Sequence, residues 1–242
     1  MTALNRTAYP YFKQSPSPRE LAELYTPTAD ELDLAERRVR SVPNRLSFLV
    51  LLKSFQRLGY FPKDEVIPAP VTSHLREQLG LDADVSASAP GASRRRYYQV
   101  IRDYLQVKPY DSSAEQVATT AIEAAVSVMD HPSDLINVAV ERLIKGSYEL
   151  PAFGTLERLA KHLRVLSHTE LYRQISSQLN QAERDYLDGL ITQPDAEVKA
   201  MLNQLKAAPK SEKLTHLVQL QQTFDELMSF GDAQPGLFHL QR

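Results

Sequence analysis

Apolar residues recur at helical spacing along almost the whole of this 242-residue chain, and this periodicity limits the folds that it can adopt. Glycine occurs only 8 times, tryptophan does not occur, and runs of β-branched residues are short. With 43% hydrophobic residues, the chain can bury a substantial core. We therefore predict an all-α protein of two consecutive helical bundles with helix-turn-helix-like elements, at residues 1–108 and 111–242.

Local signals mark the helices of the first bundle. Thr28 and Glu31 have the spacing of a capping box, Pro43 precedes the most apolar helix, and Gly59 is placed to end it. Residues 83–92 are small and are predicted to form a mobile loop. The helices before this loop are predicted over residues 18–24, 28–40, 43–58 and 71–79.

The second bundle is predicted to begin with an alanine-rich helix that is capped by Ser112 or Ser113 and continues through Met129. A helix with a wide apolar arc is expected after His131 and Pro132 and reaches Ile144. The remaining helices are predicted from an N-cap at Thr155 to Leu166, near residues 170–179, over residues 181–191 and, as a final amphipathic helix, over residues 212–230.

A basic, aromatic helix is predicted as the last helix of the first bundle, over residues 93–105. Ser93 is its expected N-cap, which places three arginines in the first turn, where the helix dipole disfavours positive charge. One face of this helix is predicted to pack in the core, and the opposite face is predicted to contact phosphates. The alternative for this second face is a charged surface that only contacts solvent. The first face holds Tyr97, Tyr98, Ile101, Tyr104 and Leu105, and the second holds Arg95, Gln99, Arg102 and Gln106.

Charge is unevenly distributed along the chain. The whole sequence has a net charge of −2, but 13 basic and 6 acidic residues between Arg37 and Lys108 give that segment +7 and leave −9 for the rest. Such asymmetry favours a polyanionic partner for the basic segment.

The sequence contains no known catalytic or metal-binding pattern, such as a glycine-rich phosphate loop, an HExxH pair or a GxSxG turn. His162 and His168 have the wrong spacing for one helix face, and neighbouring acids such as Asp64 and Glu65 diverge on a helix. Cysteine does not occur, which excludes thiol nucleophiles and fits a reducing compartment. We therefore predict no catalytic residue and no metal site.

The beginning of the sequence shows no basic-then-apolar secretion signal. The longest apolar run, Leu46 to Leu52, is too short to cross a bilayer. We therefore expect a cytoplasmic protein without a membrane partner.

Several short segments follow one another in a characteristic order. They are Glu20–Thr26, Asn44–Phe48, Gln78–Gly80, Arg94–Arg102, Lys108–Tyr110, Leu150–Pro151 and Thr155–Leu159. In this order and spacing they resemble the N-terminal region of the Tn-three family of transposases, which move replicative transposons. The resemblance covers nearly the whole chain.

This resemblance implies a bipartite, bacterial, nucleoid-associated region that binds double-stranded DNA at the terminal inverted repeats of a transposon. Each half would read a different part of the repeat. The aspartate-aspartate-glutamate catalytic domain, with its Mg²⁺, is expected to lie downstream, so we expect neither a cofactor nor catalysis in this chain. Self-association is considered through the C-terminal helix or through the remainder of the transposase.

The DNA contacts are predicted from basic and amide side chains on two helices. Helix-end or flexible basic groups fix the register on phosphates, whereas arginine and glutamine can read guanine and adenine edges. The alternative for each residue is a solvated surface charge. The phosphate candidates are Arg45, Arg94, Arg96 and Lys108, the base-edge candidates are Arg95, Gln99 and Arg102, and the second bundle contributes Arg158, Lys161, His162 and Arg164.

Two other functions remain open on the sequence alone. The chain could be a protein-interaction scaffold that docks a partner through its amphipathic C-terminal helix, and such a scaffold predicts no salt-dependent DNA binding. An enzyme with a site assembled from distant residues ranks last, because no group of carboxylates or histidines indicates one.

Overall fold

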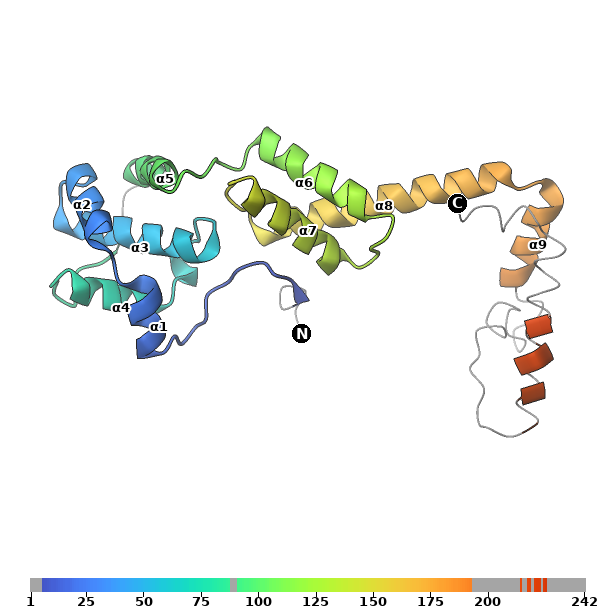
Figure 1. Ribbon diagram of the computed structural model, residues 1–242, viewed down its shortest axis with the longest axis horizontal. Helices are drawn as coiled ribbons and strands as arrows, with labels where there is room; N and C mark the ends of the chain where they lie inside the picture. The colour runs from blue at the N-terminus through green and yellow to red at the C-terminus, as the bar shows by residue number, and fades with distance from the viewer. Residues whose placement is uncertain are drawn as a thin grey trace. The chain divides into compact units, whose positions relative to one another are not determined.

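The computed structural model describes residues 6–87 and 91–192, together with residues 214, 217, 218, 220–222, 224 and 225. These residues contain no β-strand, and Lys108 and Tyr148 form an isolated β-bridge. The predicted all-α class is therefore confirmed, whereas the helix-turn-helix-like elements stay a prediction. The helices are α1 (Pro18–Tyr25), α2 (Ala29–Arg38), α3 (Val42–Leu58), α4 (Ala69–Gln78), α5 (Gly91–Leu105), α6 (Ser112–Ala125), α7 (Pro132–Lys145), α8 (Phe153–Gln178) and α9 (Gln181–Ile191), with a 3-10 turn at Asp64–Val66 (Figure 1).

The chain divides into two compact units, Met1–Val165 and Leu166–Arg242, and this division falls within α8. The first unit contains two hydrophobic clusters, one built mainly from α1 to α5 and the other mainly from α6, α7 and the start of α8. The boundary predicted between residues 108 and 111 lies where the chain passes from one cluster to the other, not between the compact units. That each of the two bundles binds DNA separately stays a prediction.

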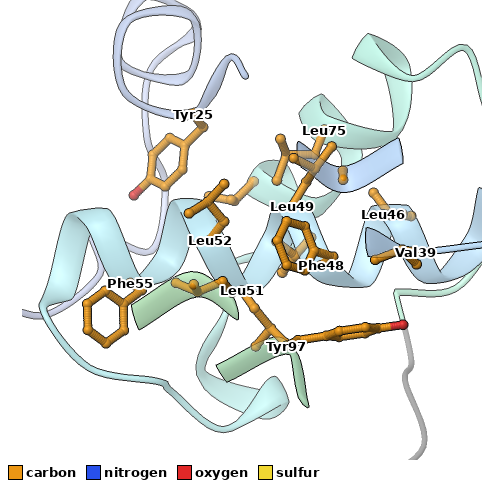
Figure 2. Packing of buried hydrophobic residues seen from close by; sticks show 14 of the residues in the cluster. Tyr25, Val39, Leu46, Phe48, Leu49, Leu51, Leu52, Phe55, Leu75 and Tyr97 are labelled. Carbon is orange, nitrogen blue, oxygen red and sulfur yellow. The ribbon is translucent and has the colours of Figure 1, made fainter. Parts of the chain in front are cut away.

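Helix α3 forms the centre of the first cluster. Every residue from Leu46 to Phe55 is buried, and α1, α2, α4 and α5 all pack against this helix. Figure 2 shows Tyr97 of α5 beside α3, where its ring meets that of Phe48 edge-on with centroids 5.6 Å apart. Gly59 then ends α3 in the left-handed conformation, with φ 72°, as its position in the sequence predicts.

The second cluster depends on small residues. Ala114 and Ala118 of α6 and Ala139 of α7 are fully buried, and such residues let two helices approach closely. Tyr9, which precedes α1, also belongs to this cluster. Its hydroxyl donates a hydrogen bond of 2.6 Å to the carbonyl of Pro151. The N-terminal segment is therefore anchored beside the start of α8.

Two further local predictions are confirmed. Thr28 and Glu31 form the capping box expected at the start of α2, with hydrogen bonds of 3.3 and 2.8 Å. Helix α9 has the predicted bounds, residues 181–191, and Asn180 caps it.

Three predicted N-caps are wrong. The cap of α6 is Asp111, because its carboxylate accepts from the amides of Ser113 and Ala114 at 2.9 and 3.1 Å, and a negative charge suits a helix N-terminus better than a serine hydroxyl. Ser93 and Thr155 both lie inside helices that begin two residues earlier. Extending an existing helix by a residue costs little, so a cap-like side chain does not fix where the helix starts.

The predicted ends of other helices also need correction. Helix α6 stops at Ala125, and the side chain of Val128 is 80% exposed in the turn that follows. Ile144 of α7 is exposed rather than part of the buried arc. The separate helices predicted on either side of residues 167–169 form one helix, α8, because no glycine or proline interrupts the chain there.

Two predicted segments lie partly or mostly outside the described residues. Of the predicted mobile loop, residues 88–90 lie outside them, and Gly91 and Ala92 belong to α5. Most of the C-terminal helix predicted at residues 212–230 also lies outside them, although Leu214, Leu217 and Phe224 are helical. A search of the described helices finds none with the length and apolar character that crossing a bilayer requires.

One ion pair is buried in the core of the first cluster. Lys53 of α3 lies 2.7 Å from the carboxylate of Glu31, and their side chains are only 7% and 3% exposed. Gln56 donates a further hydrogen bond of 2.6 Å to Glu31. Burial alone would raise the pKa of the Glu31 carboxyl. The hydrogen bonds from Lys53, the amide of Thr28 and Gln56 have a larger, opposite effect and hold this pKa below its usual value.

Removing the cation from this pair should destabilise the fold strongly. The variant Lys53→Met keeps the volume of the side chain but leaves Glu31 charged and unpaired, so we expect the free energy of unfolding at pH 7 to fall by about 3–5 kcal/mol in urea denaturation. The control is Lys145→Met, which removes a cation from an exposed pair with Glu141 and should change stability by less than about 1 kcal/mol. Equal effects of the two variants would contradict this account.

Candidate nucleic-acid interface

Arg94, a predicted phosphate contact, is bound within the protein. Its two terminal nitrogens donate to the two carboxylate oxygens of Asp64 at 2.5 and 2.6 Å, and its Nε donates to the hydroxyl of Tyr98 at 2.6 Å. The bonds to Asp64, followed by that to Tyr98, raise the pKa of Arg94 above its usual value against the effect of burial. Arg94 therefore fastens α5 to the 3-10 turn that follows α3.

Contacts between aromatic rings also attach α5 to α3. The ring of Tyr98 stacks on Phe61 with centroids 3.9 Å apart, and Phe61 lies 4.5 Å from Phe55 of α3. The guanidinium of Arg102 lies over the ring of Phe61, at 5.3 Å from its centroid. Tyr97 and Tyr98 of α5 thus serve packing, as their helical spacing predicts, whereas Tyr104, which was expected on the same face, is 39% exposed.

Arg102, a predicted base reader, is also paired. Its Nε and Nη2 each lie 2.7 Å from Oε2 of Glu149, and the two side chains are 19% and 13% exposed. Burial raises the pKa of the Glu149 carboxyl, and the bonds from Arg102 only partly offset this effect. Arg102 therefore ties α5 to the segment that precedes α8.

The exposed face of α5 carries the other predicted contacts. Arg95, Arg96 and Gln99 are exposed, and Arg95 makes no ion pair with any described residue. The guanidinium of Arg96 lies 5.7 Å from the centroid of the Tyr97 ring. Gln99 donates a hydrogen bond of 2.8 Å to Asp103. The structure thus keeps Arg95 and Gln99 together but turns Arg102 toward Glu149.

The remaining phosphate candidates of the first bundle differ in their surroundings. Arg45 is partly buried, donates to the carbonyl of Val39 at 3.2 Å and pairs with Glu36 at 3.2 Å. Lys108 is exposed, and its ammonium lies 4.9 Å from the centroid of the Tyr148 ring. Lys108 is therefore more accessible to a phosphate than Arg45.

Three of the four candidates on α8 lie away from its buried face, which holds Leu156, Ala160 and Leu163, whereas Arg164 lies at the edge of that face. Arg158 and His162 are exposed, and Lys161 forms an exposed pair with Glu157 at 2.8 Å. Arg164 donates two hydrogen bonds of 2.9 Å to Asp130, in the turn before α7. Arg158, Lys161 and His162 thus form a second exposed basic surface in the first unit.

The sequence analysis missed the acidic partners of three arginines. Asp64, Glu149 and Asp130 lie 30, 47 and 34 positions from Arg94, Arg102 and Arg164, and nothing in the sequence links such distant residues. The bond between Gln99 and Asp103 could have been predicted, because residues four apart are neighbours on a helix.

The chemistry available on these two surfaces is hydrogen bonding and charge. Guanidinium groups can bind phosphates or guanine edges, and the amide of Gln99 can bind an adenine edge. Within the described part of the chain, no three acidic or histidine side chains gather as a metal site. The surfaces are therefore suited to binding a polyanion.

Residues 1–163 match the family model described as a domain of unknown function, DUF4158. The chain belongs to the DUF4158 family. This assignment covers all of α1 to α7 and the first part of α8, and so includes both candidate surfaces.

The DUF4158 chain is also similar to three transposases. It is 25% identical over 203 residues to the transposase for transposon Tn501 of Pseudomonas aeruginosa, and 23% identical over 194 residues to that for Tn1546 of Enterococcus faecium. It is 25% identical over 204 residues to the transposase for Tn3926 of Escherichia coli. These matches cover 83%, 78% and 83% of this chain but about 20% of each transposase, in its N-terminal part. The predicted resemblance to the N-terminal region of Tn-three family transposases is thus confirmed.

The different positions of the arginines of α5 predict different effects on stability. In Arg102→Ala, the carboxylate of Glu149 loses its hydrogen bond and its ion pair while it stays mostly buried, so we expect the free energy of unfolding to fall by about 2–3 kcal/mol. In Arg95→Ala an exposed side chain is removed, and the change should stay within about 0.5 kcal/mol. Urea denaturation of both variants at pH 7 measures the difference, and a neutral Arg102→Ala would show that the ion pair does not hold α5.

Proposed function

We propose that this chain is the DNA-binding N-terminal part of a transposase and that it recognises the terminal inverted repeats of a transposon. The proposal combines the similarity to transposases with one structural observation. Arg95, Arg96 and Gln99 are exposed on one helix, while Arg94 and Arg102 hold that helix in place. Such an arrangement presents donors on a rigid element, as recognition of a duplex requires.

The two exposed surfaces have separate tasks in this proposal. On α5, Arg95 and Gln99 contact base edges in a major groove, while Arg96 and Lys108 bind phosphates and fix the register. On α8, Arg158, Lys161 and His162 contact a second part of the repeat. Arg102 acts as a positioning residue through Glu149, and Arg94 has the same role through Asp64.

The net charge supports this use of the first bundle. The segment from Arg37 to Lys108 carries +7 although the whole chain carries −2, so a local positive potential exists without a basic protein overall. Strand cutting and joining, and the Mg²⁺ that they use, belong in this proposal to the part of a transposase that the chain does not cover.

The proposal is tested by a binding titration with two duplexes, one carrying a candidate terminal repeat and one with the same bases scrambled. We expect tighter binding to the repeat and a linear fall of log K with log salt concentration, with a slope of about −0.9 for each phosphate that is neutralised. Binding to neither duplex at low salt would contradict the proposal and favour the protein-interaction scaffold.

Variants of α5 extend this test to the surface itself. Arg95→Ala combined with Arg96→Ala should weaken binding and reduce the salt slope by about 1, because Arg96 binds a phosphate and each phosphate contact contributes about one unit. The loss of Arg95, a base-edge contact, should also reduce the preference for the repeat. The control combines Arg19→Ala and Arg173→Ala, which likewise removes two exposed arginines, here ones paired with Glu23 and Glu170, from α1 and α8. Equal losses for the two double variants would mean that α5 contributes only general charge.

A further inference from the structure

The exposed face of α5 also carries an acid. Asp103 follows Arg95 by eight positions and Gln99 by four, so the three side chains lie on successive turns of one face. Asp103 is exposed, and Gln99 donates to its Oδ1 at 2.8 Å. A carboxylate on a surface that meets DNA repels phosphates, so its presence there requires a reason.

Helix stability does not supply this reason. Asp103 lies in the last turn of α5, where the partial negative charge of the helix end disfavours an acid. Among the described residues it forms no ion pair. Its bond with Gln99 is an exposed contact between neighbours on a helix, which contributes little to stability.

Base-edge chemistry does supply a reason. A carboxylate can only accept hydrogen bonds, and in the major groove cytosine presents an amino donor with no acceptor of its own beside it. Adenine places its N7 acceptor next to its amino group, and guanine and thymine present acceptors at the corresponding positions. An acid on the reading face therefore favours cytosine and disfavours the other three bases.

We infer that Asp103 is a specificity-determining residue that accepts a hydrogen bond from the amino group of a cytosine in the recognised repeat. This inference rests on the proposed function. Gln99 holds Oδ1, whereas Oδ2 has no hydrogen-bond partner among the described residues and can accept from the base. Arg95 lies about 12 Å away along the helix axis, at about 1.5 Å per residue, so it contacts a different base pair.

The test is a selection of binding sites from a pool of randomised duplexes, with the whole chain and with Asp103→Asn. This substitution keeps the size of the side chain and an acceptor for Gln99 but adds a donor. We expect the unsubstituted chain to select cytosine at one position, and the variant to lose that preference there, by a factor of about 5 to 100, while other positions keep theirs.

The chain offers a closely matched control. Asp185 of α9 accepts from Gln181 at 2.8 Å, with the same spacing of four residues and the same exposed setting. Asp185→Asn therefore removes the same charge from the same kind of pair, and it should leave all base preferences unchanged.

Three results would overturn the inference. If Asp103→Asn binds every duplex more tightly with unchanged preferences, Asp103 only repels DNA. If the variant has the affinity and preferences of the unsubstituted chain, Asp103 does not approach the bases. If the unsubstituted chain binds no duplex, the proposed function fails as well, and this result is distinct from the other two.

Discussion

Helix α3 is buried on all sides from Leu46 to Phe55, and the rest of the first bundle is arranged around it. A helix that is apolar all round must be enclosed, and here α1, α2, α4 and α5 enclose it. One charged residue, Lys53, lies within this run, and the capping residue Glu31 of α2 neutralises it. The same carboxylate thus starts α2 and makes the burial of α3 possible.

Helix α5 shows how a basic helix can be both anchored and exposed. Arg94, Tyr98 and Arg102 follow one another at intervals of four residues, and all three side chains are used to attach the helix. Arg95, Arg96 and Gln99 are turned to solvent by the same geometry. Two arginines with similar sequence surroundings, Arg94 and Arg95, therefore differ in role because they are 100° apart around the helix axis.

The sequence predicts well what depends on neighbouring residues and poorly what depends on distant ones. The capping box of α2, the glycine end of α3 and the buried face with Tyr97 and Ile101 follow from local spacing, and all are present. The start of α8 was misplaced, because Phe153 extends the helix ahead of Thr155 and its ring packs against Tyr9, 144 positions before it, with centroids 5.5 Å apart. The ion pair that fixes Arg102 could not be predicted from neighbouring residues either, since Glu149 lies 47 positions away.

The two candidate surfaces are linked by the short segment that precedes α8. Lys108, just after α5, exchanges backbone hydrogen bonds of 2.8 Å with Ser147 and Glu149, and the amide of Leu150 donates to the carbonyl of Gly59 at 2.8 Å. The ion pair of Arg102 with Glu149 joins the same segment to α5. Backbone hydrogen bonds and one ion pair therefore join α5 to residues 147–150, just before the start of α8.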